Sequence, residues 1–190
     1  MTALLTAVVA VGVLAGCSEK TGGNASTTEP TGGGQTSTAA TSTGSSSGLS
    51  IAKFAEKPCD LLTSAQVAKL GEVAAPETST STLGPKCTWE GKNISKNSSY
   101  VVYATVDKDV ESMISNVKGN PVFTDKKIGD VRVVINDSTD GVIHCRAIIA
   151  VSKTESATVD ADIAAEERSA KPACTEVESV AKMVIETLKG

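Results

Sequence analysis

The sequence predicts a single α+β domain in which helices pack on an antiparallel sheet of about five strands, stapled by two disulfides. Three observations predict this fold class. Apolar residues recur with helical spacing near both ends of residues 51–190, short alternating segments fill the middle, and four of the five cysteines lie in this range. A stretch of about 140 residues without internal repeats has the size of one domain.

The first predicted elements are a short helix and two strands. Thr63 can cap the free amides of a helix while Gln66 reaches back in capping-box spacing, and Gly71 ends the helix. Residues 86–91 predict a short strand. Residues 100–106, which are rich in β-branched and aromatic side chains, predict the next one.

A second helix is predicted over residues 109–118, and Gly119 with Pro121 stops it. Its side chains at helical spacing form one apolar face. That face comprises Val110, Met113, Ile114 and Val117.

The following segment predicts a β-hairpin. Residues 131–135 form one arm, residues 136–141 supply turn-forming side chains, and residues 142–151 form the other arm. The second arm should be the central strand of the sheet, because its apolar residues alternate onto one face. They are Ile143, Cys145, Ala147, Ile149 and Val151.

The chain closes with a strand and a helix. Residues 157–163 alternate small apolar with polar side chains, which predicts a half-exposed strand. Thr175 and Glu178 have capping-box spacing at the start of the final helix. The apolar stripe of this helix comprises Val177, Val180, Ala181, Val184 and Leu188.

Residues 1–16 predict a lipoprotein signal peptide. Their apolar run ends in Leu14-Ala15-Gly16 directly before Cys17 and is shorter than the roughly 20 residues that span a bilayer. We expect cleavage before Cys17, lipid attachment to its thiol, and residence at the extracytoplasmic face of the cell membrane. Residues 17–50 are almost entirely Thr, Ser, Gly and Ala, which predicts a disordered tether, either bare or O-glycosylated.

The remaining cysteines form an even set, as expected in an oxidising compartment. Four cysteines allow three pairings. We favour Cys59 with Cys87 and Cys145 with Cys174, because each pair closes a loop of roughly 30 residues and stabilises by about 3.5 kcal/mol. Redox-active thiols and a zinc site are both disfavoured, because no two cysteines form a C-x-x-C pair.

Composition excludes some partners. The net charge is −4, with no cluster of Lys or Arg, so nucleic acid is not an expected partner. Only five aromatic residues are present, two Phe, two Tyr and one Trp, so a stacking platform has little to be built from. No cofactor is predicted.

Four elements carry a family resemblance. They are the opening Pro58-Cys59-Asp60-Leu61-Leu62-Thr63, the element Cys87-Thr88-Trp89, Cys145, and Cys174 at the start of an amphipathic C-terminal helix. Together they resemble actinobacterial lipoproteins of the domain of unknown function 3558 family, over residues 58–188. The resemblance implies an extracytoplasmic, lipid-anchored, disulfide-containing domain and carries no activity with it.

Few residues carry chemistry. His144 is the only imidazole for acid–base work, and no G-x-S-x-G nucleophile elbow accompanies it, so we predict no catalytic residues. The pairs Asp107 with Asp109 and Asp160 with Asp162 lack the further oxygen ligands of a Ca²⁺ loop, and we predict no metal site. Residues 166–168 predict a solvated charge run.

Two functions remain open. The first is a monomeric, non-catalytic envelope protein that binds an unidentified small ligand or partner protein. The second is a cell-wall-directed hydrolase or lipid carrier that uses the sheet face around His144. The most informative feature is the sheet face that carries His144, Arg146, Ile148 and Ala150. If a helix covers this face, it is core, and if the face lines an open cleft, it is a candidate ligand site.

Overall fold

The structure is a computed structural model that describes residues 48–190. Its elements, in chain order, are η1 (Ala52–Phe54), η2 (Pro58–Leu61), α1 (Ser64–Val67), β1 (Glu77–Ser81), β2 (Gly84–Trp89), β3 (Ser99–Thr105), α2 (Val110–Val117), β4 (Val122–Ile128), β5 (Val131–Asp137), β6 (His144–Ala150), β7 (Ser156–Asp162) and α3 (Ala173–Lys189). The predicted signal peptide over residues 1–16, Cys17, and the tether up to residue 47 lie outside the described residues.

One antiparallel sheet carries the fold, in the order β1-β2-β3-β7-β6-β5-β4. The α+β class is confirmed, but the sheet has seven strands and not about five. The strands missing from the prediction are the two edges, β1 and β4. Edge strands bury little surface and lack the apolar alternation that marks a strand: β1 contains only Glu, Thr and Ser, and the middle of β4 is Thr124-Asp125-Lys126-Lys127.

The central strand is β7 and not β6, which lies next to it. The prediction that β7 is half exposed is wrong, because every residue of the strand except Asp162 is buried. Its polar side chains Ser156, Thr158 and Asp160 are all buried. Alternation in the sequence therefore identified the strand correctly and its surroundings wrongly.

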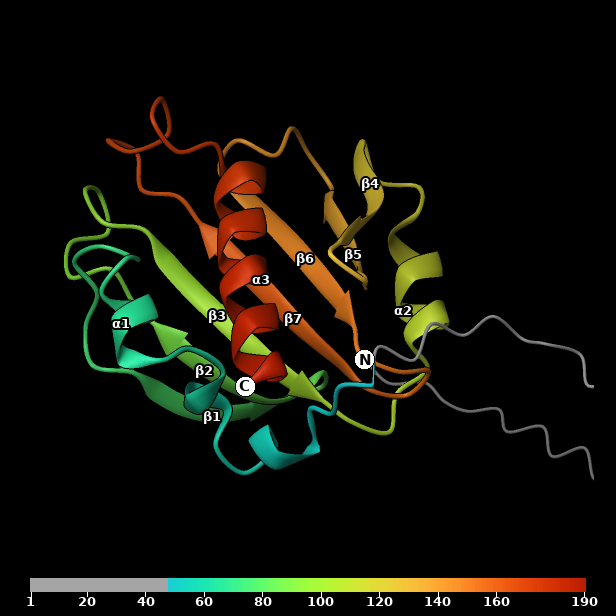
Figure 1. The fold of residues 1–190 in the computed structure, drawn as a ribbon. Helices are drawn as coiled ribbons and strands as arrows, with labels where there is room; N and C mark the ends of the chain where they lie inside the picture. Colours follow the sequence, from blue (N-terminus) through green and yellow to red (C-terminus); the bar gives the residue numbers. More distant parts are fainter. Residues whose placement is uncertain (1–47) are drawn as a thin grey trace, which may run out of the picture. The chain divides into compact units, whose positions relative to one another are not determined.

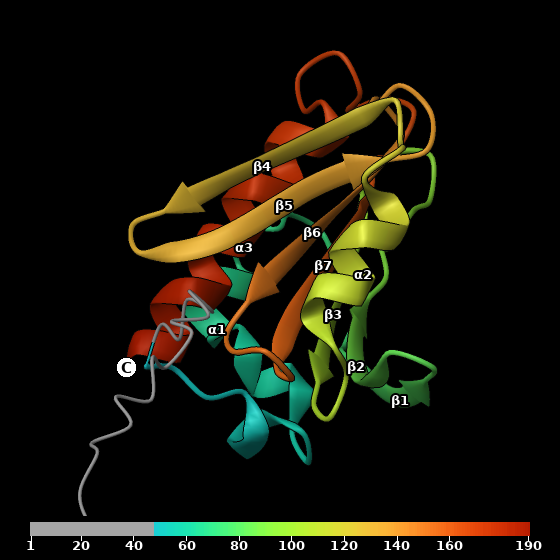
Figure 2. The same ribbon diagram turned by 90° about the vertical axis from the view of Figure 1, so that its right-hand side faces the viewer.

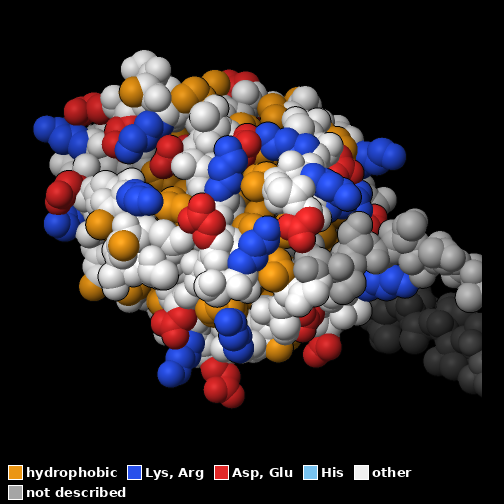
Figure 3. Space-filling model, viewed as in Figure 1, with side chains coloured by type: hydrophobic (Ala, Val, Ile, Leu, Met, Phe, Trp, Pro, Cys, Tyr) orange, Lys and Arg blue, Asp and Glu red, His pale blue; other side chains and the backbone are white. Residues whose placement is uncertain are grey.

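Helix α3 packs on one face of the sheet, against β5, β6 and β7 (Figure 1). All five residues of the predicted stripe are buried in the main core. A fully buried aliphatic side chain of this size stabilises a fold by about 2 kcal/mol. On the outer side of this layer, cationic and anionic side chains are interspersed (Figure 3), and Glu178 binds both Lys126 and Lys182.

The start of α3 differs from the prediction. The helix begins at Ala173 after Pro172, so Thr175 and Glu178 lie inside the first turns and form no capping box. The amides of Ala173 and Cys174 donate instead to the carbonyls of Val142 and Gly141, in the loop before β6. Backbone acceptors from this loop satisfy the free helix amides, so no side-chain cap is required.

Helix α2 packs on the opposite face of the sheet (Figure 2). Asp109 caps it by accepting a hydrogen bond from the amide of Ser112. The predicted apolar face is confirmed, because it packs into a second, smaller core. That core comprises Val110, Ile114, Val134, Ile148 and Ala150, with Met113, Val117 and Phe123 partly buried against it.

The segment before the sheet is fastened to α3. The predicted capping box of α1 is present: the amide of Gln66 donates to Thr63 Oγ1 at 3.3 Å, and the amide of Thr63 donates to Gln66 Oε1 at 2.8 Å. The helix ends at Val67, before Gly71, and so is shorter than predicted. Gln66 Nε2 also donates to the carbonyl of Met183 in α3 at 2.9 Å.

Both disulfides have the predicted pairing. Cys59 to Cys87 joins η2 to β2, and Cys145 to Cys174 joins β6 to the first turn of α3. Each links residues 28 or 29 positions apart, so each closes a loop that stabilises by about 3.5 kcal/mol. Among the helices of residues 48–190, none is both long enough and apolar enough to cross a bilayer.

Candidate functional site

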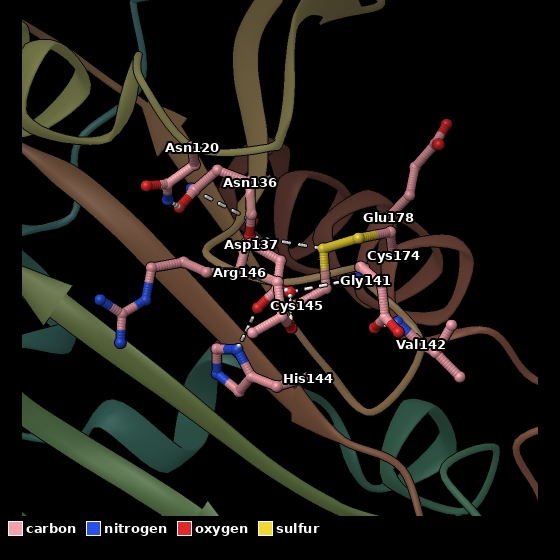
Figure 4. The surroundings of a disulfide bond; sticks show 12 residues. Asn120, Asn136, Asp137, Gly141, Val142, His144, Cys145, Arg146, Cys174 and Glu178 are labelled. Atoms are coloured by element: carbon pink, nitrogen blue, oxygen red, sulfur yellow. Dashed lines mark hydrogen bonds and ion pairs between the residues drawn. A yellow bond between two sulfur atoms is a disulfide. The ribbon is translucent and has the colours of Figure 1, made fainter.

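Strand β6 divides its side chains between the two layers. Cys145 points to the α3 side, where it forms its disulfide, while Arg146 extends in the opposite direction (Figure 4). Residues 144, 146, 148 and 150 therefore share the face of the sheet that carries α2, which we call the α2 side.

Helix α2 covers only part of the α2 side. Ile148 and Ala150 belong to the smaller core beneath the helix and are buried. His144 and Arg146 lie beyond it, with 38% and 32% of their side chains exposed. The face around His144 is therefore core at one end of β6 and accessible at the other.

An ion pair lies where the covered part ends. Arg146 stands directly opposite Asp160 in the β6–β7 ladder. Its Nε donates to Asp160 Oδ1 at 2.6 Å and its Nη2 donates to Asp160 Oδ2 at 2.7 Å, a bidentate geometry. This hydrogen bonding raises the pKa of Arg146 against the opposing effect of burial.

Tyr103 of β3 extends the polar row across the sheet. The Arg146 guanidinium carbon lies 6.0 Å from the centre of the Tyr103 ring, and Lys86 Nζ of β2 lies 5.9 Å from it. Burial and then the charge of Asp160 raise the pKa of the Tyr103 hydroxyl, so the residue stays neutral at physiological pH. Two cations thus lie close to the ring of Tyr103, which is itself almost buried on the α2 side.

His144 lies between two carboxylates. Its Nδ1 is 3.2 Å from Asp137 Oδ1, and its Nε2 is 3.9 Å from Asp160 Oδ1. Each ring nitrogen therefore faces an acidic side chain, and among residues 48–190 neither has a hydroxyl or thiol group as a hydrogen-bond partner. This arrangement suits a positioned, hydrogen-bonded imidazole better than the base of a serine or cysteine nucleophile.

Asp137 organises the β5–β6 turn from a buried position. Its carboxylate accepts hydrogen bonds from the amide and hydroxyl of Thr139 and from the amide of Gly141. Although burial opposes ionisation, these hydrogen bonds, together with the one to His144, lower the pKa of Asp137 to about 2. The turn predicted over residues 136–141 is thus held by one ionised side chain.

A small pocket opens beside Arg146, and we call it the α2 pocket. It has a volume of about 190 Å³. Its lining residues come from three parts of the fold: the β1–β2 turn, α2, and strands β6 and β7. They are Leu83, Met113, Asn116, Val117, Arg146, Ile148 and Thr158. Apolar side chains form most of the wall, and a guanidinium, an amide and a hydroxyl residue supply the polar part.

Two buried threonines on the α2 side have hydroxyl groups without partners. Thr158 lines the α2 pocket, whereas Thr105 does not. Each is fully buried, and neither Oγ1 has a hydrogen-bond partner among residues 48–190. A buried hydroxyl left unpaired lowers the stability of a fold by about 1–3 kcal/mol, and the fold carries this cost at both threonines.

A second, wider pocket of about 360 Å³ lies on the other side of α2, next to Arg132. Here the guanidinium uses all three of its nitrogens: Nε and Nη2 form a bidentate pair with Asp125, and Nη1 donates to Glu111. The charge of Arg132 in this pocket is therefore neutralised by two carboxylates within a surface ion network.

The remaining predicted site residues are structural. Asp109 caps α2, and Asp160 pairs with Arg146. In the part of the chain that the structure describes, no group of three His, Cys, Asp or Glu side chains is placed to hold a metal ion. Cys145 and Cys174 are bonded to each other. The solvated charge run is only partly correct, because Glu167 accepts hydrogen bonds from the amide and hydroxyl of Ser98.

The sequence marks Arg146 and Ile148 as candidate site residues, but not Thr158 or Met113. Thr158 lies in a strand predicted to be half exposed, and the helical spacing places Met113 only on the apolar face of a helix. The signal that could have found Thr158 is the register of β6 with β7, in which Ile148 stands opposite Thr158. This register is known only from the structure.

The family model described as protein of unknown function (DUF3558) matches residues 12–187 of the chain. No curated protein and no solved structure matches the chain.

Proposed function

The chain belongs to the DUF3558 family of proteins of unknown function, and from this premise we propose that it is a lipid-anchored protein of the actinobacterial cell envelope. In this proposal it is a non-catalytic monomer at the extracytoplasmic face of the membrane. It binds a small ligand or a partner protein on the α2 side of its sheet.

Two features support the anchor. Leu14-Ala15-Gly16 precedes Cys17 at the end of an apolar run, and the four other cysteines pair without remainder, as export to an oxidising compartment favours. Cys17→Ala should abolish membrane retention in cell fractionation, whereas the natural protein should stay in the membrane fraction. A variant that still sediments with the membrane would contradict the anchor.

The α2 pocket carries the binding proposal. An accessible sheet face with an apolar pocket and a few convergent polar groups is the usual form of a binding site. Here the guanidinium of Arg146 lies at its rim, and the buried, unpartnered Thr158 is part of its wall. Arg146 is accessible there, with about a third of its side chain exposed, whereas Thr158 is fully buried in the wall.

The pocket can be blocked without touching the core. Asn116 is exposed on α2 and lines the pocket, while Ser112 is exposed on the same helix and does not. We expect native mass spectrometry of the full chain, extracted from its host membranes in mild detergent, to show a bound species with the natural protein and with Ser112→Trp. Asn116→Trp should lose it. A bound species retained by Asn116→Trp, or absent from all three proteins, would contradict binding in this pocket.

The second candidate is a hydrolase or lipid carrier that acts through His144. The 3.2 Å contact between His144 Nδ1 and Asp137 favours it, because catalytic imidazoles are commonly oriented by a carboxylate. His144→Ala should leave the phenotype of the host unchanged if the protein only binds. A phenotype equal to that of the deletion would support the catalytic candidate.

A further inference from the structure

Strand β1 forms one edge of the sheet, away from the α2 pocket (Figure 2). We infer that this edge binds an extended, basic segment of a partner protein, which pairs with β1 as an eighth strand of the sheet. Three features of the structure support this docking surface: the open backbone of β1, the difference between the two sheet edges, and a groove beside β1 that carries a carboxylate.

The backbone of β1 is open on its outer side. Thr80 stands opposite Pro85, which has no N–H, so these two residues cannot exchange a pair of hydrogen bonds. Because bonded and non-bonded pairs alternate along an antiparallel ladder, the N–H and C=O groups of Thr78 and Thr80 point away from β2. Within residues 48–190, no further strand or loop pairs with these outward groups. They are therefore available to another chain.

The two edges of the sheet differ in charge. Edge strands are commonly protected from pairing with other chains by charged side chains, especially Lys. The opposite edge, β4, carries Asp125, Lys126 and Lys127 in its middle. The middle of β1 is Thr78-Ser79-Thr80, which is exposed and uncharged, and its sole charged residue is Glu77 at the start. Strand addition is therefore favoured at β1 and opposed at β4.

A groove of about 300 Å³ borders β1. The chain between η1 and η2 forms one wall, and β1 forms the other. Thr78 stands opposite Cys87, whose sulfur is bonded to Cys59 of η2, so the side chains of Thr78 and Thr80 point to this groove. A strand added beside them places every second side chain on the same side. The groove can therefore select the alternate side chains of the added segment.

One carboxylate gives the groove its preference for a cation. Glu56 is the only charged residue of its lining. The Glu56 side chain is exposed and forms no ion pair within the described part of the chain. The other lining residues are Ala, Pro, Ser and Thr, so no large apolar anchor is present. The backbone of the added strand thus supplies most of the affinity, and a Lys or Arg beside Glu56 supplies selectivity.

Three capped heptapeptides test this docking surface. The first alternates Thr and Lys, the second has Glu in place of Lys, and the third is the Lys peptide with its three central amides N-methylated. Each is titrated into the ¹⁵N-labelled full chain in detergent micelles. We expect the Lys peptide to slow hydrogen exchange of the Thr78 and Thr80 amides but not of the Ser79 amide, which faces β2. Binding should be at least about threefold weaker for the Glu peptide and about tenfold weaker for the N-methylated one.

The outcomes separate the possible occupants of the edge. Equal binding of the N-methylated peptide would overturn strand addition, and equal binding of the Glu peptide would overturn the basic class. Protection of Thr78 and Thr80 that grows with protein concentration, without peptide, would show that a second copy of the chain occupies the edge instead. Absence of binding by all three peptides would overturn the docking surface but not the α2 pocket, because the two share no lining residue.

A pair of proline variants locates the site. Thr80→Pro removes an outward N–H, which an edge strand tolerates, and should weaken binding of the Lys peptide by about tenfold. Lys127→Pro in β4 is the control. Ile128 and Val131 close a two-residue turn there, so the Lys127 amide also faces outward. This variant should leave binding unchanged, and equal effects of both variants would overturn the assignment to β1.

A second pair of variants tests the carboxylate without altering the backbone. Glu56→Gln should weaken binding of the Lys peptide by about threefold, the effect of one exposed ion pair, and should leave the Glu peptide no weaker. Glu166→Gln, at an exposed glutamate in the loop before α3, is the control and should change neither. A Glu56→Gln variant that binds the Lys peptide as tightly as the natural protein would overturn the role of Glu56.

Discussion

Arg146 of β6 and Asp160 of β7 stand opposite each other in the sheet and form a bidentate ion pair at the point where α2 stops covering the α2 side. The pair holds the guanidinium at the rim of the α2 pocket. Asp160 is almost fully buried, whereas Arg146 keeps about a third of its side chain exposed. The position of the guanidinium at the rim depends on this fixed geometry.

Asp160→Ala should therefore lower the free energy of unfolding by about 2 kcal/mol, because it leaves a partly buried guanidinium without its partner. Asp125→Ala is the control: it breaks a bidentate pair of the more exposed Asp125 with Arg132 and should cost less than about 1 kcal/mol. Urea unfolding of the two variants checks the difference. Equal losses would show that the Arg146 pair is an ordinary surface ion pair.

Asp137 should make the stability of the fold depend on pH in the acidic range. Its pKa is about 2 in the folded protein, against an ordinary value of 3.8, so the ionised form contributes stability above about pH 4 and loses it as the pH falls toward 2. The contribution is about 2 kcal/mol. We expect the stability gap between the natural protein and Asp137→Asn to be full at pH 6 and to shrink between pH 4 and pH 2. A gap that stays constant with pH would contradict the role of this carboxylate.

Gly141 should tolerate no side chain. Its φ is +71°, and a Cβ at this position would lie 2.6 Å from Cys174 Sγ. Gly141→Ala should lower stability by about 2–3 kcal/mol through backbone strain and a clash with the disulfide. Gly119→Ala, at a position with open space and no positive φ, should leave stability the same or higher. Thermal unfolding under non-reducing conditions compares them.

Removing the unpartnered hydroxyls should stabilise the protein. Thr105→Val and Thr158→Val should each raise the free energy of unfolding by about 1 kcal/mol, because an isosteric methyl replaces a buried group that makes no hydrogen bond. Chemical denaturation of both variants, measured without added ligand, checks this expectation. A loss of stability at either position would show that its hydroxyl does have a partner in solution.

The disulfide framework and most elements were predictable from the sequence. The even cysteine count and loop lengths favoured the pairing that the structure has, and local apolar spacing marked α2 and α3. Local signals could not place the start of α3, because its first amides are satisfied by Gly141 and Val142, more than 30 residues earlier. They also missed β1, an edge strand without apolar side chains that pairs with β2.

The candidate site was predictable only in part. Alternation along the sequence predicts which face of β6 carries Arg146, and it marks that face as either core or ligand site. The pocket requires three elements distant in sequence, the turn with Leu83, α2 with Met113, and β7 with Thr158, to meet on one side of the sheet. The residue pattern of each element taken alone does not predict that the three lie together.

Site-specific photo-crosslinking in the host tests the central claim most directly, namely that the α2 side binds a component of the envelope. A photoreactive phenylalanine analogue replaces Asn116 at the pocket or Ser112 elsewhere on the same helix. The account predicts a discrete covalent adduct, small molecule or protein, from position 116 and none from position 112. No adduct from position 116, or equal adducts from both positions, would contradict it.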